Sequence, residues 1–471
     1  IGTSFERFNA TMKTDFDLLD NLKLGVSFFL TQSTRKSYIT DLDAYTNPSQ
    51  YSRTVNPYLN VKDEDGRYIY DQDIDGLNEA YIQFNILEER KNTDYSLKNL
   101  AIKPMLTLEY KPVSWLRLST QFGMQLENSK TEKFADQDSY YVRKYRQYTE
   151  YGSYNNKKYF LPDGGIIQNW DDEMSQYQWK LQGEFNKVFN ELHSVDVMAG
   201  MEMRGNKSTQ IHTKGFGFDS RALTTKPLII PESVSSANDA KFKQYQKTEN
   251  ENRYLSYYMT ASYSYDNRYT LSGSIRWDRS NLWGTNSKYQ NKPLWSVGVN
   301  WNINREDFFN CSWVDMLKLR ASYGIGGNIA KNAAPYLTAN YYTSALVGGL
   351  YGNISSPPNP NLRWEKTTTV NVGVDFSMFT NRLVGSFEVY NKKSVDLLAN
   401  QMGVPTEGFG YSTLTFNNGA MRNRGFELTL QGDLFRESAF KWNMGFLLGY
   451  NKNKVTKINV EAPVYFLQLD Y

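Results

Sequence analysis

The feature that most constrains this chain is a series of short segments in which apolar and polar residues alternate. Residues 369–376 place Val370, Val372 and Val374 between polar or small residues, and residues 383–390 repeat the pattern after a turn. A period of two fits a β-strand, whose successive side chains point to opposite faces, and does not fit a helix. The apolar face therefore points either into the core of a soluble β-protein or toward lipid around a water-filled barrel.

Short and long connections alternate between these segments. Asp266–Arg268 is a short connection of the Asp/Asn turn type, whereas every second connection runs to roughly 15 to 60 residues, far above the usual loop length. Outer-membrane barrels have this layout, with short periplasmic turns and long extracellular loops. A soluble propeller or a set of sandwiches also gives many strands, but does not confine long loops to every second connection. The fourteen segments are residues 5–14, 22–33, 102–110, 115–127, 177–185, 195–205, 254–265, 269–279, 295–303, 317–325, 369–376, 383–390, 425–434 and 442–451.

The composition also favours a membrane barrel. Aromatic residues make up 15% of the chain, although its mean hydropathy is −0.62. Trp295 and Trp301 enclose Val297 and Val299, as expected where aromatic rings mark the two membrane interfaces. No run approaches the roughly 18 consecutive apolar residues of a spanning helix, so only a barrel could cross the membrane. The fold class predicted is an all-β, transmembrane antiparallel β-barrel.

Charge and cysteine content exclude other classes of protein. The chain has 53 basic and 50 acidic residues, interspersed, with a net charge of +3, and nothing in this balance indicates nucleic acid as a partner. Cys311 is the only cysteine, so a scaffold held by intrachain disulfides is excluded.

Several long motifs occur in order in the second half of the chain. They are SYYMTASYSYDNRYTLSGSIRWDRSNLWG from Ser256, LKLRASYGIGGN from Leu317, NPNLRWEKTTTVNVGVDFSMFTNRLVGSFEVYNKKSVDLL from Asn359, NNGAMRNRGFELTL from Asn417 and WNMGFLLGYNKNKV from Trp442. This series resembles the barrel of the SusC/RagA-like TonB-dependent transporters of Bacteroidetes outer membranes. The first 250 or so residues resemble that family only loosely.

The resemblance implies a barrel of about 22 strands filled by an N-terminal plug. It also implies a periplasmic TonB box and a SusD-like surface lipoprotein that covers the barrel. We count fourteen strands and find neither a plug nor a TonB box, so residues 1–471 are interpreted as a partial β-barrel domain. The chain also opens without an export signal, which we expect to have been removed or to lie upstream.

The implied function is TonB-dependent active import of oligomeric nutrients, either glycan oligosaccharides or peptides, across the outer membrane. The expected surroundings of the barrel are the lipid bilayer and lipopolysaccharide. A passive 14-stranded outer-membrane porin is the alternative, because an even number of strands could close by itself.

Aromatic and basic side chains crowd one long loop and are the candidate ligand contacts. Aromatic faces stack on sugar rings or peptide side chains, and basic groups can hold acidic substituents. The alternative is that these side chains pack the loop against its neighbours. The candidate substrate-binding residues are Tyr140, Tyr141, Arg143, Tyr145, Tyr148 and Trp170, with Tyr341 and Tyr342 in a second loop.

No residue pattern predicts catalysis or a resident cofactor. Residues 71–76, DQDIDG, match the start of a calcium-binding loop, but Ile82 stands where that loop needs a bidentate Glu. A solvated acidic loop is therefore expected, and calcium there is the one cofactor considered. His193 and His212 are the only histidines and lie far apart in sequence, which argues against a metal site or a catalytic triad. We expect the protein not to be an enzyme.

Overall fold

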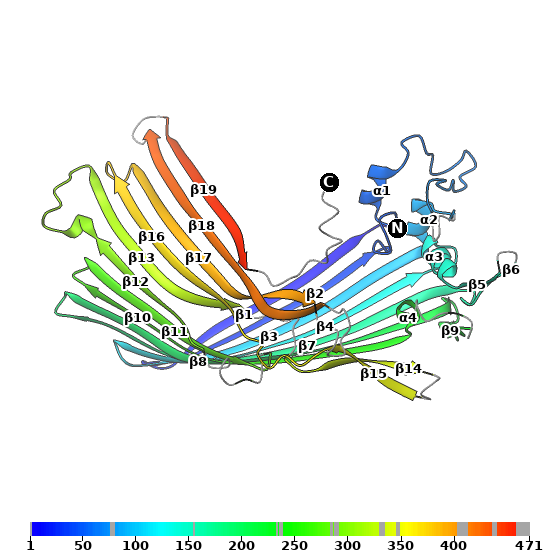
Figure 1. Cartoon of the computed structure of the whole chain (residues 1–471), viewed down its shortest axis with the longest axis horizontal. Coiled ribbons are helices and arrows are strands. Elements are labelled where there is room, and N and C mark those ends of the chain that lie inside the picture. Colours follow the sequence, from blue (N-terminus) through cyan, green and yellow to red (C-terminus); the bar gives the residue numbers. More distant parts are fainter. Residues whose placement is uncertain are drawn as a thin grey trace.

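The computed structural model describes residues 2–75, 81–153, 156–231, 234, 239–282, 286, 292–328, 335–344, 349–402, 413–435 and 440–457. One large antiparallel sheet dominates it, curled into a trough (Figure 1). Fourteen strands follow one another through the sheet in chain order, and β9 (Thr224–Lys226) pairs with β8 beside this path. Each of the fourteen predicted segments falls on a different strand of the path, which confirms the predicted fold class. The strands are β1 (Ser4–Leu19), β2 (Leu22–Ser37), β3 (Thr93–Val113), β4 (Leu116–Ala135), β7 (Gly165–Phe189), β8 (His193–Asp219), β10 (Tyr245–Tyr265), β11 (Tyr269–Ser280), β12 (Leu294–Asn302), β13 (Val314–Asn328), β16 (Glu365–Met378), β17 (Leu383–Met402), β18 (Thr413–Phe435) and β19 (Trp442–Lys457).

The short connections gather at one end of the sheet and the long ones at the other (Figure 1). In the turn from β10 to β11, Asp266 and Asn267 have φ angles of 48° and 51°. Asn and Asp tolerate this left-handed conformation better than other residues with a side chain, which explains why a compact turn forms here. The long connections carry α1 (Pro48–Thr54), α2 (Ile86–Asn92), α3 (Tyr140–Tyr148), α4 (Asp239–Phe242) and the hairpins β5–β6 (Glu150–Ser153, Asn156–Tyr159) and β14–β15 (Thr338–Ser344, Gly349–Ser356).

Several strands are much longer than predicted. β7 has 25 residues and β8 has 27, whereas a strand needs only about 9–11 residues to cross a bilayer. The extra length lies toward the long loops, where residues 207–214 read KSTQIHTK and are mostly polar on both faces. Such a segment gives no alternating pattern, and in the structure it continues the β7–β8 ladder toward the long loops.

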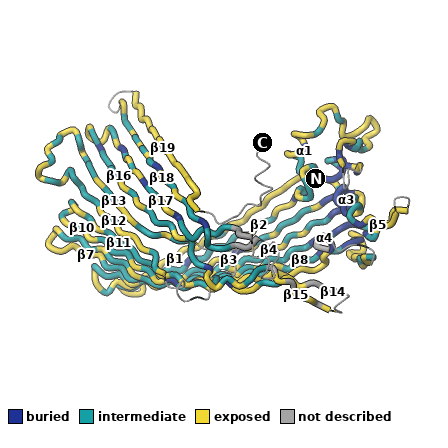
Figure 2. The backbone as a smooth tube through the Cα atoms, viewed as in Figure 1, coloured by how far each residue is buried: buried dark blue, intermediate teal, exposed yellow. Residues whose placement is uncertain are grey.

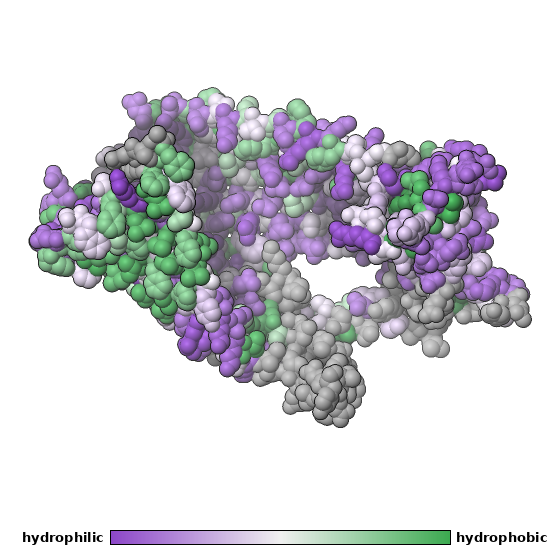
Figure 3. All heavy atoms as spheres, turned by 90° about the horizontal axis from the view of Figure 1, so that it is seen from above, coloured by the Kyte–Doolittle hydropathy of each residue, from purple (hydrophilic) through white to green (hydrophobic). Residues whose placement is uncertain are grey.

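The two faces of the sheet differ as predicted. On β16 and β17, Val372 and Phe387 are 46% and 41% exposed on the outer face. Asn371 and Glu388 lie on the inner face, where the amide of Asn371 donates to the Glu388 carboxylate at 3.2 Å. In Figure 3 hydrophilic side chains dominate the wall around the hollow, and hydrophobic side chains gather in a patch at the left of the view. The residues of this hairpin that are predicted to face lipid are Val370, Val372, Val374, Phe376, Leu383, Phe387 and Val389. The residues predicted to face the lumen are Asn371, Asp375, Ser386 and Glu388, and the register of β16 and β17 keeps the two sets on opposite faces.

The packed cores lie in the long loops and at the strand ends beside them, where Ala135, Ile166 and Phe216 take part. Figure 2 shows dark blue segments around α3 and α4, whereas the strands are mostly intermediate or exposed. This distribution fits a wall with lipid on one side and water on the other, which has no core of its own. None of the helices in the described ranges is long and apolar enough to span a membrane.

The lipid-facing assignment can be tested with two neighbouring substitutions in the full-length protein. Val372→Lys should destabilise the folded barrel by about 2–4 kcal/mol, since it places an ammonium group against lipid. Asn371→Lys is the matched control, because its ammonium enters the lumen beside Glu388 and should change stability little. Denaturant unfolding in lipid vesicles measures both, and equal losses would contradict the assignment.

Candidate functional site

The loops that follow β2 and β4 fold together into a small unit, here called the loop module (residues 38–75, 81–92, 136–153 and 156–164). Phe84 and Tyr140 are fully buried in it, with ring centroids 4.9 Å apart in an edge-to-face arrangement. Tyr51 packs edge-on against Phe84 at 5.1 Å. Buried aromatic pairs of this geometry stabilise by about 0.5–1.5 kcal/mol beyond the area that they bury. The loop module therefore has a core that joins two segments distant in sequence.

A buried carboxylate holds α3 against α2. Ser139 begins α3, and its hydroxyl accepts the N–H of Val142 at 3.2 Å, as expected of an N-cap. Glu89, in the middle of α2 and 1% exposed, accepts the N–H groups of Tyr140 at 2.6 Å and Tyr141 at 3.3 Å. Burial raises the pKa of Glu89 to about 7, and the two backbone hydrogen bonds oppose that rise.

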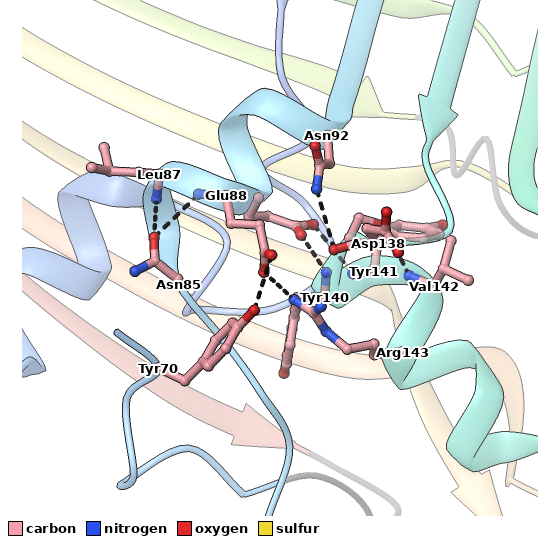
Figure 4. A network of polar contacts seen from close by, with 12 residues as sticks. Tyr70, Asn85, Leu87, Glu88, Asn92, Asp138, Tyr140, Tyr141, Val142 and Arg143 are labelled. Atoms are coloured by element: carbon pink, nitrogen blue, oxygen red, sulfur yellow. Dashed lines mark hydrogen bonds and ion pairs between the residues drawn. The ribbon is translucent and has the colours of Figure 1, made fainter. Parts of the chain in front are cut away.

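A second polar contact joins the same two helices (Figure 4). The Glu88 carboxylate lies 2.5 Å from the Arg143 guanidinium and accepts the hydroxyl of Tyr70 at 3.1 Å. Asn85 caps α2 by accepting the N–H groups of Leu87 at 2.9 Å and Glu88 at 3.1 Å. These contacts fix the orientation of α2, and the side chains of Glu88 and Glu89 on this helix both contact α3.

Most of the predicted ligand contacts in the first loop belong to the core of the loop module. Tyr140, Tyr141 and Tyr145 are buried. Arg143 is held by Glu88, and the Lys241 ammonium lies 3.8 Å from the ring centroid of Tyr148. Their surroundings fit the packing role that was the alternative reading of the sequence, and direct contact with a ligand stays a prediction.

Trp170 lies on β7 with neighbours on its ring. His212 of β8 stacks on the indole at 4.2 Å with an interplanar angle of 5°. The ammonium of Lys133 lies 5.0 Å from the indole centroid, within range of a cation–π interaction. The indole is thus already in contact with two protein side chains, and a ligand role for Trp170 also stays a prediction.

The second predicted loop presents an accessible aromatic side chain. Tyr341 on β14 is 72% exposed, and its ring lies across Gly352 of β15, where an added Cβ would sit 3.3 Å from it. Gly352 therefore lets the phenol lie flat on the hairpin as a platform. The backbone of Tyr342 is part of β14, while its side chain lies outside what the structure describes.

The acidic loop at residues 71–76 has protein partners for its first carboxylate. Asp71 is buried and accepts the Tyr51 hydroxyl at 2.6 Å and the N–H of Asp73 at 3.0 Å. Gly76 of this motif lies outside the described residues. Within the described ranges no three His, Cys, Asp or Glu residues are grouped so that they could hold a metal ion.

The inner wall carries charges that are paired across strands. Arg320 of β13 donates from Nε to Asp375 of β16 at 3.2 Å, and its Nη2 lies 3.0 Å from Glu388 of β17. The guanidinium passes over Gly373, where an added Cβ would sit 3.0 Å from it. Glycine at this position thus permits one arginine to join three strands.

A second network lies on β7, β8, β10 and β11. Arg276 donates to Asp278 at 2.7 Å and to the Ser256 hydroxyl at 2.8 Å, and it lies 3.7 Å from Glu202. Tyr258 donates to Gln182 at 3.0 Å. The sequence did not reveal these contacts, because Arg276 and Asp278 lie on β11 while Ser256 and Glu202 lie on β10 and β8.

Amides, hydroxyls and charged groups line this wall, so it can bind and guide a polar solute. Among the residues described above, no nucleophile and base are positioned for catalysis. Each network sets one guanidinium against two carboxylates, so negative charge is in excess at both places. The wall therefore offers hydrogen-bonding groups to a polar solute.

The raised pKa of Glu89 predicts a pH-dependent loop module. In the folded module the Glu89 carboxyl stays protonated up to about pH 7. When the module opens, the carboxyl regains its ordinary pKa of about 4.5. Between these two pH values the folded state therefore binds more protons than the open state. Stability should therefore fall as pH rises from about 4.5 to 7, by up to about 3 kcal/mol. Hydrogen exchange at the Tyr140 and Tyr141 amides, corrected for intrinsic rates, measures this.

The control is Glu89→Gln, which keeps one acceptor oxygen for the shorter hydrogen bond from Tyr140 and cannot ionise. Protection in this variant should not depend on pH over the same range. An identical pH dependence in both proteins would contradict the role of Glu89.

Comparison with known proteins identifies the family. The model of the TonB dependent receptor-like, beta-barrel family matches residues 26–465. TonB-dependent receptor P39 of Formosa agariphila is 26% identical over 475 aligned residues, covering 97% of this chain and 40% of the relative. TonB-dependent receptor SusC of Bacteroides thetaiotaomicron is 29% identical over 307 residues, covering 63% of this chain and 29% of SusC.

A solved structure described as that of the RagAB peptide transporter has the same fold. It superposes with a TM-score of 0.75 at 20% sequence identity, over 97% of this chain and 48% of that one. The chain thus spans less than half the length of these relatives. The predicted SusC/RagA-like barrel of the outer membrane is confirmed, and the chain belongs to the TonB-dependent receptor-like β-barrel family.

Proposed function

We propose that the protein to which this chain belongs imports oligomeric nutrients, either glycan oligosaccharides or peptides, across the outer membrane with energy supplied through TonB. The observation that carries the proposal is the wall itself, apolar outside and lined inside by polar networks such as that of Arg320, Asp375 and Glu388. Membership of the TonB-dependent receptor-like family supports active import over passive diffusion. The relatives include SusC and a protein described as a peptide transporter, so both ligand classes stay within the proposal.

We further propose a SusD-like surface lipoprotein as the partner that covers the barrel. The loop module supports this, because its packed core and the Glu89 and Glu88 contacts give it a defined surface at the end of the sheet with the long loops. Preformed surfaces lose less conformational entropy on binding than disordered loops do. Among the predicted ligand contacts, Tyr341 is best placed to meet a ligand that enters from this side, since its ring is exposed.

The outer edges of the sheet support a barrel with more strands. In the described part of the chain β1 pairs only with β2, and β19 pairs only with β18. A sheet edge in lipid leaves N–H and C=O groups without partners, so a membrane barrel must be closed. We propose that further strands of the whole protein pair with β1 and β19, and that a plug occupies the lumen, in place of the fourteen-stranded porin.

Deletion of the gene tests the proposed import. A strain that lacks the gene but retains the lipoprotein partner should lose growth on one class of polymer and recover it when the full-length gene is restored. Unchanged growth on every glycan and peptide tested would contradict active import.

Conductance in planar bilayers separates import from the porin. Full-length protein should show little steady ionic conductance, because a plugged lumen has no open aqueous path. A steady conductance would favour the porin.

A further inference from the structure

A pocket of about 230 Å³ lies on the inner face of the sheet, where β8, β10 and β11 are neighbours. Ser256 of β10 pairs in register with Glu202 of β8 and with Asp278 of β11, and all three line the pocket. The adjoining residues Tyr257 and Trp277 are exposed on the outer face. Because successive side chains of a strand point to opposite faces, the three paired residues point toward the lumen.

Arg204 of β8 lines this pocket without an ion-pair partner among the described residues. Its guanidinium lies 4.7 Å from the ring centroid of Tyr254, the residue directly opposite it on β10. A guanidinium that lies over an aromatic face is held there by the ring, while its N–H groups can still donate hydrogen bonds. The side chain is exposed, so a solute in the lumen can reach it. The pocket therefore presents a positioned guanidinium whose charge no carboxylate within the described ranges neutralises.

The two carboxylates that line the pocket contact a different arginine. Asp278 lies 2.7 Å from Nε of Arg276, and Glu202 lies 3.7 Å from its Nη2. That network alone has one negative charge in excess. Arg204 and Arg279 also line the pocket, so three guanidinium groups stand against two carboxylates and the excess becomes positive. The charge of the pocket thus favours an anionic group at Arg204.

We propose that this pocket binds one uronic acid residue of an imported glycan, with the sugar carboxylate on Arg204. A guanidinium and a carboxylate form a planar pair with two parallel hydrogen bonds, which is stronger and more directional than a neutral hydrogen bond. The hydroxyl groups of the sugar can donate to Glu202 and Asp278, because each carboxylate has about four acceptor positions. An acidic amino-acid side chain has no hydroxyl groups beside its carboxylate, which favours the sugar. This inference rests on the proposed import function and names an acidic glycan as its ligand.

Titration of full-length protein in detergent, followed by saturation-transfer NMR, tests the pocket. The probes are glucuronate, glucose as its neutral counterpart, and N-acetylglutamate as the acidic peptide counterpart. Wild type should bind glucuronate at least about tenfold more tightly than glucose, since hydrogen bonds to a charged group contribute that much or more. The variant Arg204→Gln should bind glucuronate and glucose alike.

The matched control is Arg35→Gln. The guanidinium of Arg35 also lies over a tyrosine, 5.9 Å from the ring centroid of Tyr95, so this variant loses the same charge and the same kind of contact outside the pocket. It should bind glucuronate as wild type does. Equal affinity of wild type and Arg204→Gln for glucuronate, or of wild type for glucuronate and glucose, would overturn the proposal. Tighter binding of N-acetylglutamate than of glucuronate would overturn the sugar as the ligand.

A carboxylate elsewhere in the whole protein is the competing occupant of Arg204. In that case Arg204→Gln should unfold at a lower temperature than Arg35→Gln and bind glucuronate as wild type does, and this result would also overturn the proposal. Binding is measured without transport, so it separates the pocket from the import function. Loss of the import phenotype leaves a positive titration standing, and a failed titration leaves import of other solutes intact.

Discussion

Every backbone N–H and C=O group that enters the hydrocarbon of a membrane needs a hydrogen-bond partner, because an unsatisfied group costs several kcal/mol there. The ladder from β1 to β19 supplies these partners strand by strand, each strand pairing with its neighbours in the sheet. Since side chains alternate along a strand, the same ladder creates a lipid-facing and a water-facing surface. The sheet consequently needs no core along its length, and the packed clusters lie in the loops and at the strand ends beside them.

The other parts of the molecule follow from that wall. Charges on its inner face are tolerated because they meet water and one another, as in the contact of Arg320 with Asp375 and Glu388. The loops at the end of the wall need not follow the alternating pattern of the strands. The loop module instead packs around a core that contains Phe84 and Tyr140.

The sequence predicts the wall well and the loops poorly, for one physical reason. Alternation is a local property, so Val372 and Phe387 could be assigned to a face from their own neighbours. The core of the loop module depends on contacts between distant segments, and nothing local links Phe84 to Tyr140 or Glu89 to the start of α3. The sequence therefore left open whether the tyrosines of α3 contact a ligand or pack the loop, and three of them are buried in the structure.

The central claim is that one face of each strand meets lipid and the other meets water. Spin labels attached to single cysteines along β17, in a Cys311→Ser background of the full-length protein in vesicles, test this directly. Labels at Phe387→Cys and Val389→Cys should be relaxed mainly by oxygen dissolved in the lipid, and labels at Ser386→Cys and Glu388→Cys mainly by a water-soluble nickel complex. The reverse order, or accessibility without a period of two, would contradict the account.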